Sequence, residues 1–282
     1  MQDFRRSAQP SFYDALENIK GVHLIVPSLG FKVLNTRGFA NTTNVRFAQL
    51  IDGIDNQSPH IGAPVGNALG PSDLDILSVE IIPGTASALY GMNAINGLAN
   101  FQTKNPFEHL GLSFQQKVGV NHLNDKGITA KLFNESNLRY APAWNDHGAF
   151  KINVTFTKGY DWRSTDRADI SPNIFVARTG YNESDVVDYH FQNLKADAGL
   201  HFRPTKAVEL SYTYRIAYLN NVYQRSNRFQ LANYLLQQHA FQLRGRAFQV
   251  RAYVTTENTG DSYNLRSMAE NIKISGERLH RM

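Results

Sequence analysis

The sequence predicts an α+β domain over residues 11–108, followed over residues 109–282 by antiparallel strands of an incomplete transmembrane β-barrel. Short elements separated by turn residues fill the first region, whereas long segments of alternating apolar and polar residues fill the second. Tight turns and long loops alternate between these long segments, an arrangement typical of outer-membrane barrels. Residues 1–10 are interpreted as a linker at a truncated N-terminus.

The composition excludes several classes of function. The 282 residues carry a net charge of +5 that is spread along the chain, and without a basic stripe we expect no nucleic-acid binding. Cysteine is absent, which excludes disulfides, thiolate metal sites and thiol nucleophiles. No apolar run approaches the roughly 18–20 residues of a transmembrane helix, and the first residues do not resemble a signal peptide. Barrel strands remain compatible with both absences, because they alternate and escape hydropathy scans.

Short elements are expected in order along the first region. A helix begins after its cap Ser11 and ends at Gly21. Three strands follow, at residues 31–39, 46–54 and 76–83. The next segment, from Gly84 to Gly97, is rich in glycine and other small residues, which indicates tight turns or a close approach of other backbone.

A long loop over residues 55–73 has little apolar content, and loops of this length are more often functional or mobile than structural. Four of its polar residues are the candidate substrate-binding residues: Asn56, Gln57, His60 and Asn67. Such groups suit hydrogen bonding to a neutral or weakly charged ligand, since an anion is usually held by arginine. Simple packing of the loop against its surroundings is the equal alternative.

Long alternating strands are expected from about residue 110. The clearest is residues 208–218, where one face carries apolar and tyrosine side chains and the other carries mostly polar ones. Similar alternation occurs at residues 150–160, 194–202 and 247–254, and a first strand is expected at residues 111–119. Several of these strands exceed the usual length of about 5–6 residues. They match the roughly 9–11 residues of a tilted membrane-spanning strand.

Alternating strands also occur in soluble sandwiches, so a second class of fold stays open. In that alternative the chain is a soluble or secreted β-rich module that binds glycans or mediates adhesion, and its apolar faces pack against a second sheet. The barrel is favoured by strand length and by aromatic residues near strand ends, which suit membrane interfaces. These aromatic residues are Tyr160, Trp162, Tyr189, Tyr218 and Tyr223.

Several short motifs occur in a fixed order between Ser11 and Lys104. They comprise a turn "IKGV", two short pairs and a glycine-rich segment, with these residues: Arg37, Gly38, Asp52, Gly53, Glu80, Gly84, Ser87, Tyr90, Gly91, Ala94, Gly97, Asn100, Thr103 and Lys104. In this order and spacing, the motifs resemble the plug domain of TonB-dependent outer-membrane receptors. The chain departs from the family pattern at "IKGV", at Pro83 and at "LANFQTK". The segment "KINVTFTKGYDW" is similar to large receptors of the Bacteroidetes SusC-like type.

The resemblance implies the fold, activity and partners of that family. A plug domain fills a barrel of about 22 strands, of which this chain offers roughly seven. The implied activity is TonB-dependent transport of a substrate, such as a siderophore or a glycan, across the bacterial outer membrane. The implied partners are the TonB–ExbB–ExbD complex, acting through a TonB box expected before Ser11, outer-membrane lipid and lipopolysaccharide, and a surface lipoprotein. No cofactor is implied.

The resemblance also implies roles for the motif residues. Most of them, including Gly84, Ser87 and Gly97, are expected to shape the backbone of the plug rather than to contact a ligand. Arg37, Asp52 and Glu80 are expected to form ion pairs within the plug or between plug and barrel, because an unpaired buried charge is costly.

Enzyme motifs are missing, so we expect no catalytic residue and no metal site. Ser87 does not lie in a nucleophile elbow, and the histidines lack metalloprotease spacing. The segment "GMNAING" is not a phosphate-binding loop. Asp146 and His147 are better explained by a hairpin turn than as ligands.

Overall fold

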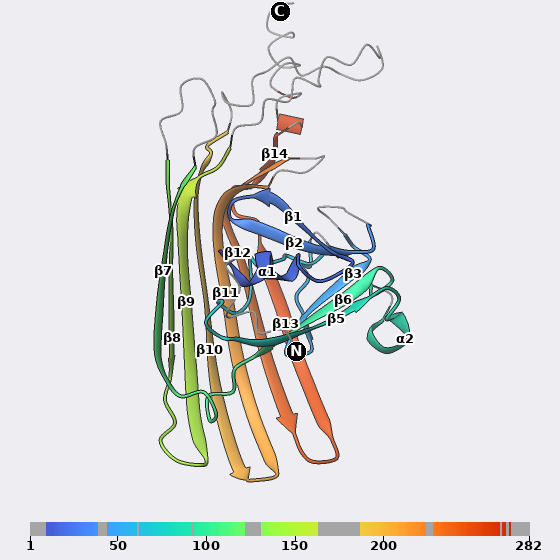
Figure 1. Ribbon diagram of the computed structural model, residues 1–282, viewed down its shortest axis with the longest axis vertical. Helices are drawn as coiled ribbons and strands as arrows, with labels where there is room; N and C mark the ends of the chain where they lie inside the picture. Colours follow the sequence, from blue (N-terminus) through green and yellow to red (C-terminus); the bar gives the residue numbers. More distant parts are fainter. Residues whose placement is uncertain are drawn as a thin grey trace, which may run out of the picture.

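The computed structural model describes residues 10–38, 44–60, 62–91, 93–121, 131–162, 187–223, 228–265, 267–268 and 271. Long strands stand side by side and form one curved wall, and the N-terminal elements all lie on one side of it (Figure 1). In the described part of the chain, no helix has the length and apolar character needed to cross a membrane.

The first elements are a short helix and a hairpin. Helix α1 (Phe12–Leu16) begins after Ser11, whose Oγ accepts a hydrogen bond from the backbone N–H of Asp14, as expected for a cap. Strands β1 (Val22–Ser28) and β2 (Phe31–Thr36) pair antiparallel. The sequence analysis predicted no strand at β1.

A mixed four-stranded sheet completes the N-terminal region. Its strands, in spatial order, are β4 (Ile54–Asp55), β3 (Phe47–Ile51), β6 (Gly97–Thr103) and β5 (Ile76–Pro83). Strands β3 and β6 run parallel, the other pairs run antiparallel, and the short helix α2 (Ser87–Tyr90) lies between β5 and β6 in sequence. Tyr13, Leu16, Phe47 and Phe101 form its core with the hairpin.

Two glycines of the glycine-rich segment lie where a side chain would come too close to other atoms. Gly97 has a φ of +135°, and a Cβ there would lie 2.5 Å from Thr36 Oγ1 and 2.9 Å from Ile82 O. Gly84 has a φ of +110°, and a Cβ there would lie 2.6 Å from the guanidinium carbon of Arg37. Glycine at these two positions therefore allows the first hairpin, the four-stranded sheet and this turn to approach one another closely.

The wall is a meander of seven strands in chain order. They are β7 (Gly111–Asn121), β8 (Lys131–Ala141), β9 (Gly148–Tyr160), β10 (His190–Thr205), β11 (Val208–Tyr223), β12 (Phe229–Arg244) and β13 (Gln249–Asn258). The two-residue strand β14 (Tyr263–Asn264) pairs with the start of β12. Short connections close β8–β9, β10–β11 and β12–β13 at one end, the lower end of Figure 1. Strands β8 and β12 were not individually predicted.

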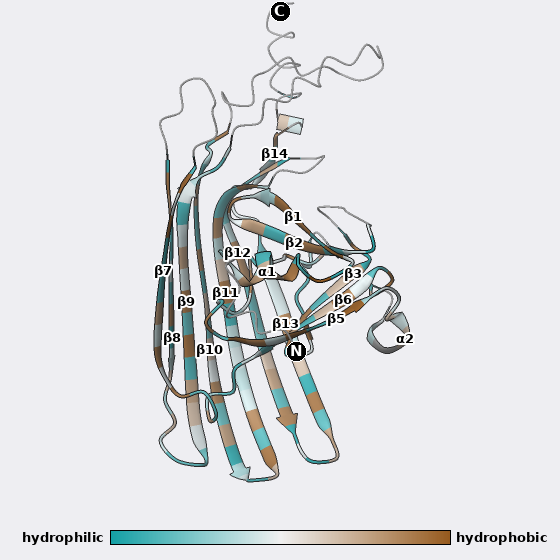
Figure 2. Cartoon of the chain, viewed as in Figure 1, coloured by the Kyte–Doolittle hydropathy of each residue, from teal (hydrophilic) through white to brown (hydrophobic). Residues whose placement is uncertain are grey.

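The two faces of the wall have inverted polarity. Lys151, Asp197 and Arg215 are buried on the face toward the N-terminal sheets, together with Asn153 and Thr155. Apolar residues of the same strands point away, with Ile152 38%, Leu200 59% and Tyr212 40% exposed. Figure 2 shows this alternation as bands along the long strands. The soluble sandwich is therefore wrong, because its apolar faces would be buried, and the predicted polar-in barrel pattern is confirmed.

Candidate functional site

A buried acidic residue ties the N-terminal sheet to the wall. Asp75 is fully buried just before β5, and its Oδ1 lies 2.7 Å from Arg139 Nε on β8. Its Oδ2 lies 2.7 Å from Lys151 Nζ on β9. Lys151 also donates to Thr103 Oγ1 at 2.7 Å and to the backbone oxygen of Lys104 at 3.1 Å. Sequence reasoning missed Asp75. The available signal was its position directly before an apolar strand, where a carboxylate is easily buried and then needs a cationic partner.

Asp52 forms the second link to the wall. Its Oδ2 lies 2.9 Å from Arg215 Nη2 on β11, while Oδ1 accepts a hydrogen bond from the backbone N–H of Thr103. The left-handed conformation of Asp52, with a φ of 54°, turns the chain between β3 and β4. The expected ion pair between the two regions is thus present at Asp52.

Arg37 and Glu80 do not follow that expectation. Both side chains are exposed, and neither forms an ion pair with another residue that the structure describes. The prediction of ion pairs at these two positions was wrong, because water solvates an exposed charge and no partner is required.

Further contacts follow the same charge pattern. Lys117 Nζ on β7 lies 2.6 Å from Asp73 Oδ2 and 2.7 Å from Glu135 Oε1. Lys195 Nζ on β10 donates to the backbone oxygens of Asn67 at 3.1 Å and Pro71 at 3.2 Å. Glu135 lies on β8 of the wall. In the contacts with Asp73, Asn67 and Pro71, the N-terminal region supplies acceptors and the wall supplies cations, so these contacts are electrostatically complementary.

Two of the four candidate substrate-binding residues organise the loop. Asn56 is fully buried, and its Nδ2 donates to the backbone oxygens of Gly66 and Leu69, each at 3.3 Å. Asn67 Oδ1 accepts a hydrogen bond of 2.7 Å from the backbone N–H of Lys32. The burial of Asn56 removes it from any surface that a ligand could reach, which corrects the expectation for that residue.

The other two candidates lie nearer to solvent. Gln57 is partly buried, and its Oε1 accepts from Asn93 Nδ2 at 3.2 Å. His60 is exposed, and its backbone N–H donates to Glu257 Oε2 on β13 at 2.8 Å. Ser58 Oγ lies 2.7 Å from the same carboxylate oxygen. Substrate binding by Gln57, His60 and Asn67 stays a prediction.

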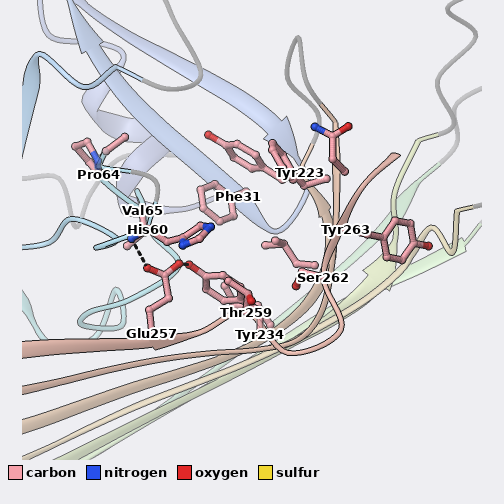
Figure 3. Close-up of a pocket in the computed structure, with 15 residues that line it drawn as sticks. Phe31, His60, Pro64, Val65, Tyr223, Tyr234, Glu257, Thr259, Ser262 and Tyr263 are labelled. Atoms are coloured by element: carbon pink, nitrogen blue, oxygen red, sulfur yellow. Dashed lines mark hydrogen bonds between the residues drawn. The ribbon is translucent and has the colours of Figure 1, made fainter. Parts of the chain in front are cut away.

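Next to His60, a cavity of ≈350 Å³ lies between the loop and the wall (Figure 3). Its volume is within the roughly 300–1,000 Å³ typical of small-molecule sites. It is lined by Phe31, His60, Ala63, Pro64, Val65, Leu219, Tyr223, Phe229, Leu231, Tyr234, Glu257, Thr259, Ser262, Tyr263 and Asn264. We call it the upper pocket, because the wall strands that line it contribute the ends opposite the short connections.

The upper pocket is largely apolar and aromatic, with few polar groups. Phe31 and Tyr223 pack edge to face with ring centroids 4.7 Å apart. The polar groups come from His60, Glu257, Ser262 and a few neighbours. Sequence reasoning missed Glu257, because only folding brings it beside the loop. Tyr223 was expected near a membrane interface but is buried and lines this pocket, which corrects that expectation.

Among the described residues, no group of three or more His, Asp or Glu side chains is placed to hold a metal ion. Burial raises the pKa of Tyr13, and the side-chain hydrogen bond with Gln49 opposes that shift. Tyr13 OH donates to the backbone oxygen of Gly66 at 3.1 Å, so this buried hydroxyl supports the loop.

The sequence of residues 1–98 matches the family model of the TonB-dependent receptor plug domain. The chain carries a TonB-dependent receptor plug domain. No curated protein matches the sequence. The sheets that carry Asp52 and Asp75 belong to the plug, and β7–β13 are the wall beside it.

Solved structures of receptors share this fold. The siderophore receptor PirA from Pseudomonas aeruginosa matches 91% of this chain and 41% of its own, with a TM-score of 0.55 and 17% identity. The ferric enterobactin receptor PfeA from the same organism matches 90% of this chain and 39% of its own, with a TM-score of 0.53 and 18% identity. The copper transporter OprC matches 87% and 34%, with a TM-score of 0.56 and 13% identity. The chain thus spans about two fifths or less of the length of these structures.

These likenesses support the plug and the strand wall as one fold. The narrower resemblance to SusC-like receptors stays a prediction. The division at residues 108 and 109 also stays a prediction, although the structure places β6 before this point and β7 after it.

Proposed function

We propose that this chain supplies the plug and adjoining wall strands of a TonB-dependent transporter in the bacterial outer membrane. The carrying observation is the inverted wall, which holds Lys151 and Arg215 against the plug while Leu200 and Ile152 face outward. A polar lumen that encloses a polar plug, within an apolar outer band, suits a protein surrounded by lipid. Lipid and lipopolysaccharide are accordingly proposed to contact the outward face.

In the proposed cycle the upper pocket captures the substrate from outside the cell. TonB, energised by ExbB and ExbD, then pulls on the plug and breaks its links to the wall. The links at Asp52 and Asp75 are discrete ion pairs, which can separate and re-form in water. Phe31, Val33 and Val65 of the plug also pack in a buried apolar cluster with wall residues, so movement of the plug must in addition expose apolar surface. The motif serines and glycines of the plug shape this moving part and perform no chemistry on the substrate.

The substrate is proposed to be a small solute or a metal chelate. PirA is named a siderophore receptor and OprC a copper transporter, and the volume of the upper pocket suits part of a molecule of that size. Glycan uptake is the second candidate that the sequence raised.

Uptake by paired bacterial strains tests this function. The receptor containing this chain is expressed in a host with TonB and in a matched host without it, and depletion of solutes from a defined medium is followed by mass spectrometry. We expect at least one solute to be taken up only when TonB is present, and a protonophore to stop that uptake. Equal uptake by both hosts would show that the protein is a passive pore or a binding protein.

A further inference from the structure

The upper pocket differs in charge from the rest of the plug–wall interface. Glu257 of β13 lines it, and no lysine or arginine is among its described lining residues. The carboxylate accepts hydrogen bonds from Ser58 Oγ at 2.7 Å, from the His60 backbone N–H at 2.8 Å and from the Tyr234 hydroxyl. All three donors are neutral, and Glu257 forms no ion pair with any residue in the described ranges. These bonds fix the position of the carboxylate without neutralising its charge.

Two plug carboxylates elsewhere along the interface have basic partners on the wall. Asp75 has Arg139 and Lys151, and Asp52 has Arg215. Glu257 of the wall has no such partner among the described residues, and neither has Asp161, which accepts a hydrogen bond from the plug at Leu29. Glu257 is the carboxylate that lines the upper pocket. A small molecule with a positive charge would supply the cation that the Glu257 carboxylate lacks.

The walls around Glu257 are suited to the same charge. Among the described residues, five phenylalanine and tyrosine side chains line the pocket: Phe31, Tyr223, Phe229, Tyr234 and Tyr263. Figure 3 shows Glu257 and Tyr234 on one side, with Phe31 and Tyr223 across from them. The face of an aromatic ring attracts a cation, and more strongly when both are shielded from water. The remaining lining includes Leu219, Leu231 and Val65, which lie in the packed cluster beneath. Its other polar residues are His60, Thr259, Ser262 and Asn264.

An anionic ligand finds the opposite environment. Anionic chelates and carboxylates are usually bound by arginine or lysine, which supply charge and several donors. The described lining offers neither, and Glu257 would repel a negative charge. A metal ion finds only one carboxylate and one imidazole among the lining residues, Glu257 and His60, which is fewer than the ligands a stable site needs.

We propose that the upper pocket selects a small solute with an aromatic or apolar body and a cationic nitrogen, which lies between Glu257 and the aromatic rings. The proposal rests on the proposed transport function, since it names the substrate class of that transporter. It assigns Glu257 as the residue that determines specificity for positive charge, and the rings of Tyr223 and Tyr234 as the walls that shield it from water.

Binding to the purified receptor in a nonionic detergent tests the proposal with three phenols of one size. The probes are 4-(trimethylammonio)phenol, its neutral isostere 4-tert-butylphenol and the anion 4-hydroxybenzoate, and binding is measured by equilibrium dialysis. We expect the cation to bind about tenfold more tightly than the neutral isostere, and the anion not to bind. Glu257→Gln should remove most of the preference for the cation and leave binding of 4-tert-butylphenol unchanged.

Three variants separate charge from folding. Tyr223→Leu should weaken binding of the cation more than binding of the neutral phenol. Tyr234→Phe should keep most of the preference for the cation, because the aromatic ring remains. Glu108→Gln removes a carboxylate outside the upper pocket and should change nothing. Each variant is checked for heat-modifiable migration in electrophoresis, which reports barrel folding independently of binding.

Several outcomes would overturn the proposal. Equal binding of cation and neutral isostere, tightest binding of the anion, or an unchanged preference in folded Glu257→Gln would each do so. Tight binding of Cu²⁺ alone that requires both His60 and Glu257 would instead indicate a metal site. Dialysis needs neither TonB nor a membrane potential, so failure here is distinct from failure of TonB-dependent uptake.

Discussion

Asp75 of the plug and Lys151 of the wall form a buried ion pair with 2.7 Å between Oδ2 and Nζ. Arg139 occupies the other oxygen of the same carboxylate. Two wall strands are thereby held by one plug residue. This arrangement makes Asp75 the most demanding of the plug–wall contacts, because removing it leaves two buried cations without their partner.

Asp75→Asn is accordingly expected to loosen the plug. Removing one partner of a buried pair costs about 3–5 kcal/mol, so the plug should unfold at a lower urea concentration and become sensitive to protease in the purified receptor. Asp73→Asn is the matched control, because its partner Lys117 is partly exposed and keeps Glu135. The control should cost less than about 1 kcal/mol. Similar protease sensitivity in both variants would contradict this account of the interface.

Alanine substitution at two glycines of the loop over residues 55–73 should lower stability by different amounts. Gly66 has a φ of +58°, and a Cβ there would lie 1.9 Å from the backbone oxygen of Lys32. Gly62 has a φ of +65° with no atom within 4 Å of its Cβ position. Gly62→Ala should cost about 1–2 kcal/mol for the left-handed backbone alone, whereas Gly66→Ala should also displace β2. Urea unfolding of the plug measures both, and equal losses would show that the close contact at Gly66 relaxes freely.

Substitutions at Asn56 and His60 should affect different properties, the first stability and the second ligand binding. Asn56→Ala removes a buried donor and should destabilise the loop by about 1–3 kcal/mol. His60→Ala removes an exposed ring that lines the upper pocket, so it should alter affinity for the phenol probes while the melting temperature stays unchanged. Unchanged affinity in a folded His60→Ala receptor would mean that this part of the loop only packs against the wall.

Asp161 predicts a pH dependence of stability. It lies one residue beyond β9, and its Oδ1 accepts hydrogen bonds from the backbone N–H groups of Leu29 at 3.3 Å and Trp162 at 3.0 Å. Burial raises its pKa from 3.8 to about 7, against the effect of those hydrogen bonds. Between pH 3.8 and about pH 7, the native carboxyl group of Asp161 thus keeps a proton that the unfolded chain has already released.

Stability from Asp161 should consequently be greatest below its unfolded pKa and fall as pH rises toward 7. The melting temperature of the receptor should be lower at pH 8 than at pH 5, and Asp161→Asn should reduce that difference. Asp146→Asn, in an exposed turn, is the control and should leave the difference as it is. The same pH dependence in the Asp161→Asn receptor would assign it to other groups.

Leu200 tests whether the outward face of the wall meets lipid. Arginine on the lipid face of a barrel costs about 2–4 kcal/mol at the midplane and about 0–1 kcal/mol near the interfaces. Leu200→Arg should lower the yield of folding into lipid vesicles, measured by heat-modifiable migration, whereas Leu200→Ala should fold nearly as well as the original. If both variants fold equally, this face is not in the bilayer at Leu200.

Period-two alternation determined much of the wall from sequence. Side chains two residues apart along a strand lie on the same face, so the pattern of residues 208–218 predicted which of them share a face without any tertiary information. The choice between barrel and sandwich was not local. It depended on which face is covered, and the burial of Lys151 beside the exposure of Ile152 decided it. Strands β1 and β8 escaped prediction because their apolar and polar residues alternate poorly.

The sequence by itself determined the order of plug motifs, the turns that need glycine and the alternating strands, because each is a property of neighbouring residues. Only the tertiary structure decided which charges pair and where a pocket forms. Ser58 and Glu257 are 199 residues apart, yet they share a hydrogen bond because the register of the wall strands and the position of the plug on them bring the two together. Register and docking are set by the sum of many distant contacts, and no short segment of the chain encodes that sum.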